Sequence, residues 1–319
     1  MKGGKKVKKK KKGFWADVYR FRALIFMAIP GFIWFIFFFY IPVFANVIAF
    51  KDFQLSPDGF ISSLKQSPWV GFDNFKFLFA SNDAWLITRN TLAYNIIFLA
   101  FNLFFAVAFA IIMSELRNKK LVKVYNTMSL LPYFLSWVVI SYFVYAFLSP
   151  DKGIINQWLT QNGQLPIQWY TDPTWWPLIF VVLNVWKSLG YNSIIYYASV
   201  MGIDPTYYEA AMVDGASKWQ QIKNVTIPQL LPMMSILLIL NIGGIFKADF
   251  GMFFSIPRQS GALYEVTTVL DTYIYNGLTA TGDIGMTAAA GLYQSVVGST
   301  LLILANFVVR KLDPDSALF

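Results

Sequence analysis

Long apolar stretches recur six times along the chain, and the segments between them hold most of the polar and charged residues. Each stretch has the roughly 20 residues that a helix needs to cross about 30 Å of hydrocarbon. Lipid offers no hydrogen-bond partners, so each stretch is expected to be a helix that satisfies its own backbone. The pattern predicts an all-α polytopic membrane protein with six transmembrane helices. Their approximate cores are Leu24–Phe50, Leu92–Met113, Leu130–Leu148, Trp176–Val200, Leu230–Phe246 and Ala288–Val309.

Proline and glycine interrupt three of these stretches. The first contains Pro30, Gly31 and Pro42, and the third contains Pro132. Proline removes a backbone hydrogen bond from a helix, so we expect kinks at these positions. The fifth stretch contains Gly243-Gly244, where the helix is expected to unwind or to let a neighbour approach closely.

A polar segment between the fourth and fifth stretches carries its own helix signals. Asp204 followed by Pro205 is typical of a helix start, because the carboxylate accepts from free N–H groups and proline needs no N–H there. A first short helix is therefore expected from about Pro205 to Val213. Gly215 then provides the left-handed turn that a β-carbon would resist.

A second helix is expected directly after this turn. Ser217 and Gln220 have the spacing of a capping box, and the helix that they begin is expected to end near Pro228. Before the turn, Ala210 and Ala211 offer little side-chain bulk, so another surface can approach the backbone. The segment therefore predicts a helical hairpin that serves as a docking knob.

Within the hairpin, Glu209-Ala210-Ala211 is followed by Gly215 and later by Val225-Thr226-Ile227-Pro228. In these residues the hairpin resembles the EAA loop of ABC importer transmembrane subunits, whose pattern usually ends Ile-x-Leu-Pro. In that family the loop is cytoplasmic and forms a coupling helix seated in a cleft of the ATPase. The alternative is a loop that merely connects two helices.

The resemblance implies ATPase-coupling roles for particular hairpin residues. The glutamate would provide a charge-assisted contact, the two alanines a close approach, and the glycine the turn. Trp219 and Ile222 would pack the second helix against the spans. The full set is Glu209, Ala210, Ala211, Asp214, Gly215, Trp219, Ile222 and Pro228.

Basic residues are concentrated on one side of the predicted spans. If the hairpin is cytoplasmic, six crossings place both termini inside, and the inside segments then hold 18 of the 26 Lys and Arg residues. This distribution follows the positive-inside rule. Residues 1–22 alone carry a net charge of +9 and the remainder sums to zero, which excludes a general nucleic-acid-binding surface. We expect residues 1–22 to form a basic cytoplasmic tail and interfacial segment that is attracted to anionic lipid. A transmembrane permease domain is expected over 23–312, with its coupling loop at about 204–228. A cytoplasmic tail is expected over 313–319.

Polar residues in or near the last three spans are candidates for the cargo path. Lys187 falls close to the midpoint of the fourth span, where a charge costs about 3 kcal/mol on insertion scales, so it should face the bundle interior. Two interpretations stay open for it: contact with cargo, or donation to carbonyls at a kink near Gly190. The candidates are Asn184, Lys187, Asn192, Asn241, Lys247, Tyr293 and Gln294.

Three further segments, Gly71-Phe72-Asp73-Asn74-Phe75, Trp186-Lys187-x-x-Gly190 and 290–295, resemble segments of carbohydrate-importing members of the same family. The absence of a Gly-Gly-Pro element from the loop before the sixth span favours the branch that serves complex oligosaccharides in Gram-positive bacteria. The resemblance implies a permease subunit of the bacterial cell membrane that forms half of a translocation pathway. The implied partners are a second permease, commonly non-identical, two ATP-binding cassette subunits that bind ATP and Mg, an extracellular solute-binding lipoprotein, and a sugar or oligosaccharide. Lys187 and Lys247 give some weight to acidic sugars.

The composition bears on the source of energy. The chain contains no Cys or His, which excludes disulfides, thiolate metal sites and imidazole catalysis. It has no G-x-x-x-x-G-K-[ST] phosphate loop, so it is expected to be a non-catalytic subunit without a cofactor of its own. None of the six cores contains Asp or Glu, the groups through which ion-coupled carriers usually work. One alternative is an ion-coupled carrier or channel for a polar solute. A second is a membrane-embedded enzyme, which would need a catalytic group at membrane depth. A third is a structural scaffold, which would not need the coupling pattern.

Overall fold

The computed structural model describes residues 18–80 and 82–312, and this part of the chain is built from helices, with one isolated bridge between Lys51 and Trp69 in place of any strand. Most of the basic segment 1–22 and the whole of the tail 313–319 lie outside the described residues. The elements of the membrane-crossing helices are α2 (Arg22–Phe35), η1 (Ile36–Tyr40), α3 (Ile41–Ala45), η2 (Asn46–Phe50), α6 (Asp83–Glu115), α7 (Lys119–Leu130), η3 (Leu131–Phe134), α8 (Trp137–Leu148), η4 (Pro173–Trp175), α10 (Trp176–Met201), α12 (Lys218–Gln221), η5 (Ile222–Thr226), α13 (Ile227–Ile242) and α17 (Ile284–Leu312).

Shorter helices fill the connections. They are α4 (Phe60–Gln66), α5 (Asp73–Ala80), α9 (Ile154–Gln161), α11 (Pro205–Val213), α14 (Phe250–Ser255), η6 (Gly261–Leu263), α15 (Tyr264–Thr267), α16 (Leu270–Asn276) and η7 (Gly277–Thr281). Five of the helical segments are long and apolar enough to cross a membrane, and a bent pair makes up to six. The all-α polytopic architecture is therefore confirmed.

The third predicted span is a broken helix. The stretch expected at Leu130–Leu148 crosses a break at which α7–η3 and α8 meet at 97°. Pro132 lies at the start of the 3₁₀ turn η3, and Ser136 begins α8 by accepting a hydrogen bond from the Val139 amide at 3.3 Å. The kink expected at Pro132 is confirmed and is a full break, because a proline and an N-capping serine four residues apart stop one helix and start another.

Other prolines, among them Pro30, Pro42, Pro228 and Pro232, are carried inside continuous helices. A single π-turn lies just before Pro42, in η1, and another lies just before Pro228, in η5. The wider turn gives room for the proline ring, which would otherwise clash with the carbonyl four residues earlier. The second hairpin helix therefore does not end near Pro228, as the sequence predicted, but runs from Lys218 to Ile242 as one span. That span also ends earlier than the predicted Phe246, because the chain turns at Gly243-Gly244.

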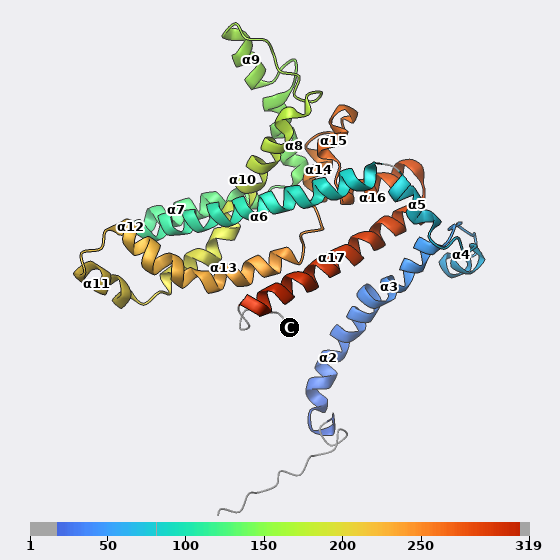
Figure 1. Ribbon diagram of the computed structural model, residues 1–319, viewed down its shortest axis with the longest axis horizontal. Coiled ribbons are helices and arrows are strands. Elements are labelled where there is room, and N and C mark those ends of the chain that lie inside the picture. Colours follow the sequence, from blue (N-terminus) through green and yellow to red (C-terminus); the bar gives the residue numbers. More distant parts are fainter. Residues whose placement is uncertain (1–17, 81, 313–319) are drawn as a thin grey trace, which may run out of the picture.

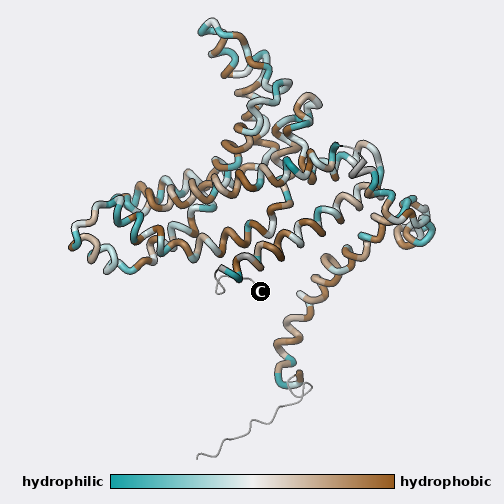
Figure 2. Tube along the Cα trace, in the orientation of Figure 1, coloured by the Kyte–Doolittle hydropathy of each residue, from teal (hydrophilic) through white to brown (hydrophobic). Residues whose placement is uncertain are grey.

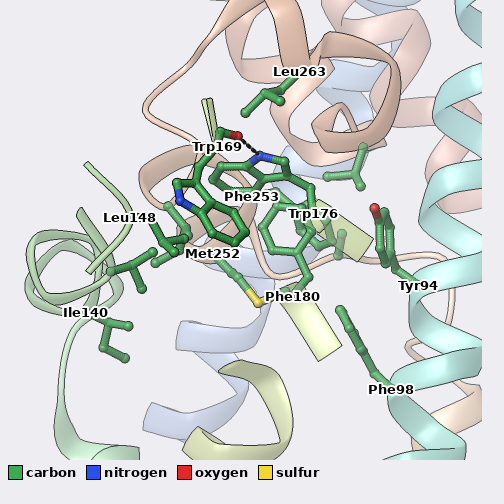
Figure 3. Close-up of a cluster of buried hydrophobic side chains, with 14 residues drawn as sticks. Tyr94, Phe98, Ile140, Leu148, Trp169, Trp176, Phe180, Met252, Phe253 and Leu263 are labelled. Carbon is green, nitrogen blue, oxygen red and sulfur yellow. Dashed lines mark hydrogen bonds between the residues drawn. The ribbon is translucent and has the colours of Figure 1, made fainter. Parts of the chain in front are cut away.

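The centre of the fold is the pairing of α6 with α10, and α7 lies against α10 where Gly190 allows the backbones to touch. A β-carbon at Gly190 would lie 2.2 Å from the Ser129 carbonyl oxygen. A cluster of 14 buried side chains, six of them aromatic, then fixes α8, α10 and α14 together. Figure 3 shows Trp176, Phe180 and Phe253 at its centre, where the Trp176 indole N–H donates to the Trp169 carbonyl at 2.6 Å.

The first span stands apart from this bundle. No side chain along α2 or α3, both within the described part of the chain, is buried, and Figure 1 shows α2 diverging from the other helices. The span joins the rest near α17, where the Asn74 amide donates to the carbonyls of Ala49 and Lys51 at 3.0 and 2.9 Å.

The two ends of the bundle differ in what they carry. In Figure 1, α11 and α12 lie at one end of α6, whereas α5 and α16 lie at the other. Figure 2 shows brown, hydrophobic stretches along the long helices and teal residues in the α11–α12 hairpin and in the segments around α4 and α9. The hairpin therefore projects beyond the apolar part of the molecule, on the side opposite α4 and α5.

Candidate functional site

The α11–α12 hairpin is capped at each of its helix ends. The Asp204 carboxylate accepts the Thr206 amide at 2.9 Å, and hydrogen bonds from the Thr206 backbone and side chain hold the pKa of Asp204 below its usual range. At the far end of α11, Gly215 has φ +78°, and the Ala216 amide donates to the Ala211 carbonyl at 2.9 Å. These contacts confirm the predicted helix Pro205–Val213 and its left-handed turn.

The second helix begins with the predicted capping box. The Ser217 amide donates to Gln220 Oε1 at 2.7 Å, and the Gln220 amide donates to Ser217 Oγ at 3.4 Å. Two side-chain contacts then fix the hairpin to the bundle. The Tyr208 and Thr226 hydroxyls lie 2.9 Å apart, and Lys218 pairs with Glu115 at the end of α6, also at 2.9 Å. The hairpin is thus held at the foot of α6 and α13.

Much of the apolar surface of the hairpin is uncovered. Glu209, Ala210, Asp214 and Pro228 are exposed, while Ala211 and Ile222 are half-buried. Trp219 is 69% exposed, so the expectation that it packs against the spans of this chain is wrong. It belongs instead to a set of outward-facing apolar side chains: Tyr207, Met212, Val213 and Trp219.

A cavity of about 500 Å³ lies between α6, α10 and α13. Four predicted cargo-path residues line it: Asn184, Asn192, Asn241 and Lys247. Six polar or aromatic residues outside the predicted set line it as well: Asn95, Phe98, Asn102, Tyr191, Tyr196 and Asp249. Amides offer both donors and acceptors, and aromatic rings offer apolar faces, so this wall suits a cargo that presents hydroxyls and C–H groups together.

Polar side chains of the cavity lining are held by hydrogen bonds. The Asn102 amide donates to Asn184 Oδ1 at 2.8 Å, and the Ser188 hydroxyl donates to Asn102 Oδ1 at 2.8 Å. Asn95 donates to the carbonyl of Ile245 at 2.9 Å. Asn95 and Asn102 are seven residues apart, so they share one face of a helix. This spacing was the signal in the sequence that would have added both to the predicted set.

Lys187 lies outside the cavity lining. Its ammonium donates to the carbonyls of Pro132 and Tyr133 at 3.3 and 2.9 Å, and also to that of Leu135. It lies 5.2 Å from the ring centre of Trp137. Of the two interpretations, the structure therefore shows donation to carbonyls at a kink, but the kink is the break between η3 and α8 and not one near Gly190. A cation here satisfies the carbonyls that a helix end leaves free.

Tyr293 and Gln294 also lie outside the cavity lining. The Tyr293 hydroxyl is 3.0 Å from that of Thr88. Gln294 donates to the Phe246 carbonyl at 3.1 Å and to Asp271 Oδ2 at 3.2 Å. Asp271 in turn accepts the Ala248 amide at 2.7 Å, and burial raises the pKa of its carboxyl. These contacts hold the segment that carries Lys247 and Asp249, on its side away from the cavity.

Comparison with known proteins places these features in a family. Residues 104–314 match the family described as "Binding-protein-dependent transport system inner membrane component". The chain is 30% identical to the "Polygalacturonan/rhamnogalacturonan transport system permease protein YteP" of Bacillus subtilis (strain 168), over 97% of this chain and 94% of that protein. It is also 30% identical to "Protein LplB" of the same organism, over 94% and 92%.

Solved structures give the same result. The chain resembles one from the "Crystal structure of a bacterial ABC transporter involved in the import of the acidic polysaccharide alginate", with a TM-score of 0.83 and 32% identity over 94% of this chain and 99% of that one. A second structure, of an alginate transporter with an alginate pentasaccharide-bound periplasmic protein, also gives a TM-score of 0.83, over 94% and 98%. The likeness extends over 94% of this chain in both structures.

Proposed function

This chain belongs to the family of binding-protein-dependent transport system inner membrane components, and from that premise we propose that it forms half of the pathway by which an ATP-driven importer moves an acidic oligosaccharide. It is a multi-pass membrane permease, not an enzyme. The observation that carries the proposal is the continuous helix Lys218–Ile242, which starts in the hairpin and ends at the cavity wall with Asn241. At 1.5 Å per residue, these 25 residues span roughly 37 Å.

This helix couples movement at its two ends. A force on Trp219 is transmitted along α12, η5 and α13 to the cavity wall, because a continuous helix resists compression and bending. The helix can flex at the π-turn before Pro228 and at Pro232, which lies inside α13. Displacing the hairpin therefore moves Asn241 relative to Asn95 and Asn184, which changes the side on which the cavity opens.

The surface of the hairpin supports the choice of partner. Glu209 and Asp214 offer charges, Ala210 and Ala211 allow close approach, and the exposed apolar side chains need a partner to cover them. We assign this surface to an ATP-binding cassette subunit, which binds ATP and Mg and supplies the force that this chain lacks a phosphate loop to generate. The hairpin, both termini and the tails 1–22 and 313–319 are then cytoplasmic.

The first span supports a second permease subunit. Along α2 and α3 the span buries no side chain against its own chain, so this part of its apolar surface is free for another one. We assign that role to a second permease, commonly non-identical in this family, which closes the other half of the pathway. Two cassette subunits and an extracellular binding lipoprotein complete the assembly, and the lipoprotein delivers the cargo to the side opposite the hairpin.

The choice of an acidic oligosaccharide as cargo rests on the residues that line the cavity and on the relatives. The amides of Asn95, Asn184 and Asn192 match sugar hydroxyls, and the Tyr191 ring offers an apolar face. Lys247 is an exposed cation on the same wall. The relatives named above handle polygalacturonan, rhamnogalacturonan and alginate, and this supports an oligosaccharide that contains uronic acids.

Reconstituted vesicles test this function. The permease pair is inserted with its cassette subunits, and uptake of an oligogalacturonate is measured with its binding protein outside and ATP inside. We expect uptake only when ATP and both permeases are present. Uptake by this chain without a cassette subunit would instead establish an ion-coupled carrier or channel. In the same vesicles, the variant Asn184→Leu is expected to lower uptake while ATP hydrolysis continues.

A further inference from the structure

Four cations lie close together in the sequence where α6 ends and α7 begins, at the hairpin end of the bundle. All four side chains are exposed, and they are those of Arg117, Lys119, Lys120 and Lys123. Figure 1 shows the start of α7 at the same end of α6 as α12. Lys218 of α12 pairs there with Glu115, the last residue of α6, at 2.9 Å. This basic cluster therefore lies beside the contact that fixes the hairpin to the bundle.

The basic cluster has no acidic partner among the described residues. Neither of the two ion pairs between described residues involves one of its members. Glu115, the nearest carboxylate in the sequence, is already paired with Lys218. Lys119 and Lys120 precede Lys123 by four and three residues on one helix, and at these spacings Cβ atoms lie about 5–6 Å apart. Like charges at these spacings repel, so an anion beside them would stabilise the arrangement.

The same helix carries an uncovered apolar stripe. The side of α7 with Val122 and Ser129 faces the bundle, where the Ser129 backbone meets Gly190 of α10. Four apolar side chains recur at i, i+3, i+4 and i+7, so they lie on a different side of the helix, within about 100° of arc. They are between 44% and 66% exposed, and they are Leu121, Val124, Tyr125 and Met128. Exposed apolar surface of this kind marks contact with a membrane or with another protein.

The order of charge and apolar surface along α7 favours lipid. This helix is the first arm of the bent pair that is apolar enough to cross a membrane. Lys120 lies four residues before Val124, at the edge of the stripe. With the stripe in hydrocarbon, the lysine ammonium groups extend to the level of the headgroups, as long cationic side chains do at helix ends. Anionic headgroups attract cations at that level. A protein partner would instead have to supply both a matching apolar face and several carboxylates.

We propose that the basic cluster is a binding site for anionic phospholipid headgroups, with the apolar stripe of α7 against the acyl chains. The ammonium groups and the Arg117 guanidinium donate charge-assisted hydrogen bonds to the phosphate oxygens. The site goes beyond the proposed function. It rests on that function only in placing these headgroups in the cytoplasmic leaflet, on the side of the hairpin.

The experiment measures which lipid contacts the stripe. Val124→Cys carries a bimane fluorophore in the assembled transporter, whose other subunits have had any cysteines replaced. The transporter is placed in phosphatidylcholine nanodiscs that contain an increasing fraction of nitroxide-labelled lipid, with the nitroxide near the headgroup. One series uses labelled phosphatidylcholine and the other labelled phosphatidylglycerol. Comparing how strongly the two lipids quench the bimane gives the preference of the site for the anionic lipid.

Four further substitutions are made in this labelled transporter. Lys120→Gln and Lys123→Gln each remove one charge of the basic cluster, whereas Lys120→Arg keeps the charge. Lys152→Gln is the control, because it removes an exposed cation from the α8–α9 connection and leaves the cluster intact. No ATP is added, so the preference for anionic lipid is measured independently of transport.

We expect the bimane-labelled parent to prefer phosphatidylglycerol by about tenfold. Each Lys→Gln variant is expected to lower this preference about fivefold, the factor that one cation near an anionic surface contributes. Lys120→Arg and Lys152→Gln should keep the preference of the parent. Equal quenching of the parent by the two lipids would overturn the site. A bimane that neither lipid quenches would also overturn it, because another subunit would then cover the stripe. A transporter that prefers anionic lipid but takes up no cargo with ATP would contradict the proposed function alone.

Discussion

Replacing Lys187 with methionine removes the ammonium that braces the break between η3 and α8 and leaves an unbranched side chain of similar length. The carbonyls of Tyr133 and Leu135 lose their donor, whereas that of Pro132 keeps the Leu135 amide at 3.2 Å. The Tyr133 ring, which stacks on Tyr191 with centroids 4.3 Å apart, also loses the cation 5.7 Å from its centre.

The magnitude follows from two opposing effects. A polar group left without a partner costs about 1–3 kcal/mol, so two carbonyls cost roughly 2–6 kcal/mol. Removing a charge from the middle of a span stabilises the folded protein by about 3 kcal/mol. The difference runs from roughly −1 to 3 kcal/mol, and we expect the free energy of unfolding to fall by about 1 kcal/mol.

The assay is reversible unfolding in mixed detergent micelles, followed by tryptophan fluorescence because Trp137 adjoins the break. Lys247→Met is the matched control, since Lys247 is an exposed lysine of the cavity wall, and its stability is expected to stay within about 0.5 kcal/mol of the wild type. The reasoning is refuted if Lys187→Met unfolds as the wild type does while uptake of acidic cargo alone falls. That result would mean that Lys187 reads the charge of the cargo.

Three further predictions concern the hairpin and its surroundings. Gly215→Pro is expected to abolish transport while the protein still inserts, because proline fixes φ near −65° where the structure has +78°; uptake at the wild-type rate would contradict this. Glu115→Lys is expected to lower transport several-fold, and adding Lys218→Glu should restore it if the pair at 2.9 Å fixes the hairpin to α6; a double variant as poor as the single one would count against that contact. For Asp271, burial raises the folded-state pKa, so the folded state binds the proton more tightly than the unfolded one. Stability is then lost as pH rises from the ordinary carboxyl pKa of about 3.9 through the raised value. Thermal unfolding of Asp271→Asn and of the wild type across this pH window tests this. The stability of the variant minus that of the wild type should grow as pH rises, and a difference that does not change with pH would disprove the buried charge.

The sequence was most informative where structure is local. The caps at Asp204, Gly215 and Ser217 depend on neighbours within a few residues, so spacing alone located the hairpin. The same reasoning misplaced the end of the second helix, because nothing in the sequence shows that a π-turn will carry Pro228. An exposed Trp219 was also missed, since amphipathic spacing cannot distinguish a partner subunit from the rest of the same chain.

Long-range contacts limited the prediction of the cargo path. The carbonyls that Lys187 binds lie 52 to 55 residues away, so no local pattern identifies them. Gln294 lies in the last span but reaches the segment after α13, and its role became visible only once the two were folded together.

The central claim is that the hairpin is cytoplasmic and covered by an ATP-binding subunit. The chain has no cysteine, so Val213→Cys, at a side chain that is 88% exposed at the end of α11, gives one unique thiol. The decisive measurement is labelling of this thiol by a membrane-impermeant maleimide, applied from each side of sealed vesicles with and without the ATPase. We predict labelling from the cytoplasmic side only, and protection when the ATPase is bound. Labelling from the outer side, or equal labelling with and without the ATPase, would contradict the account.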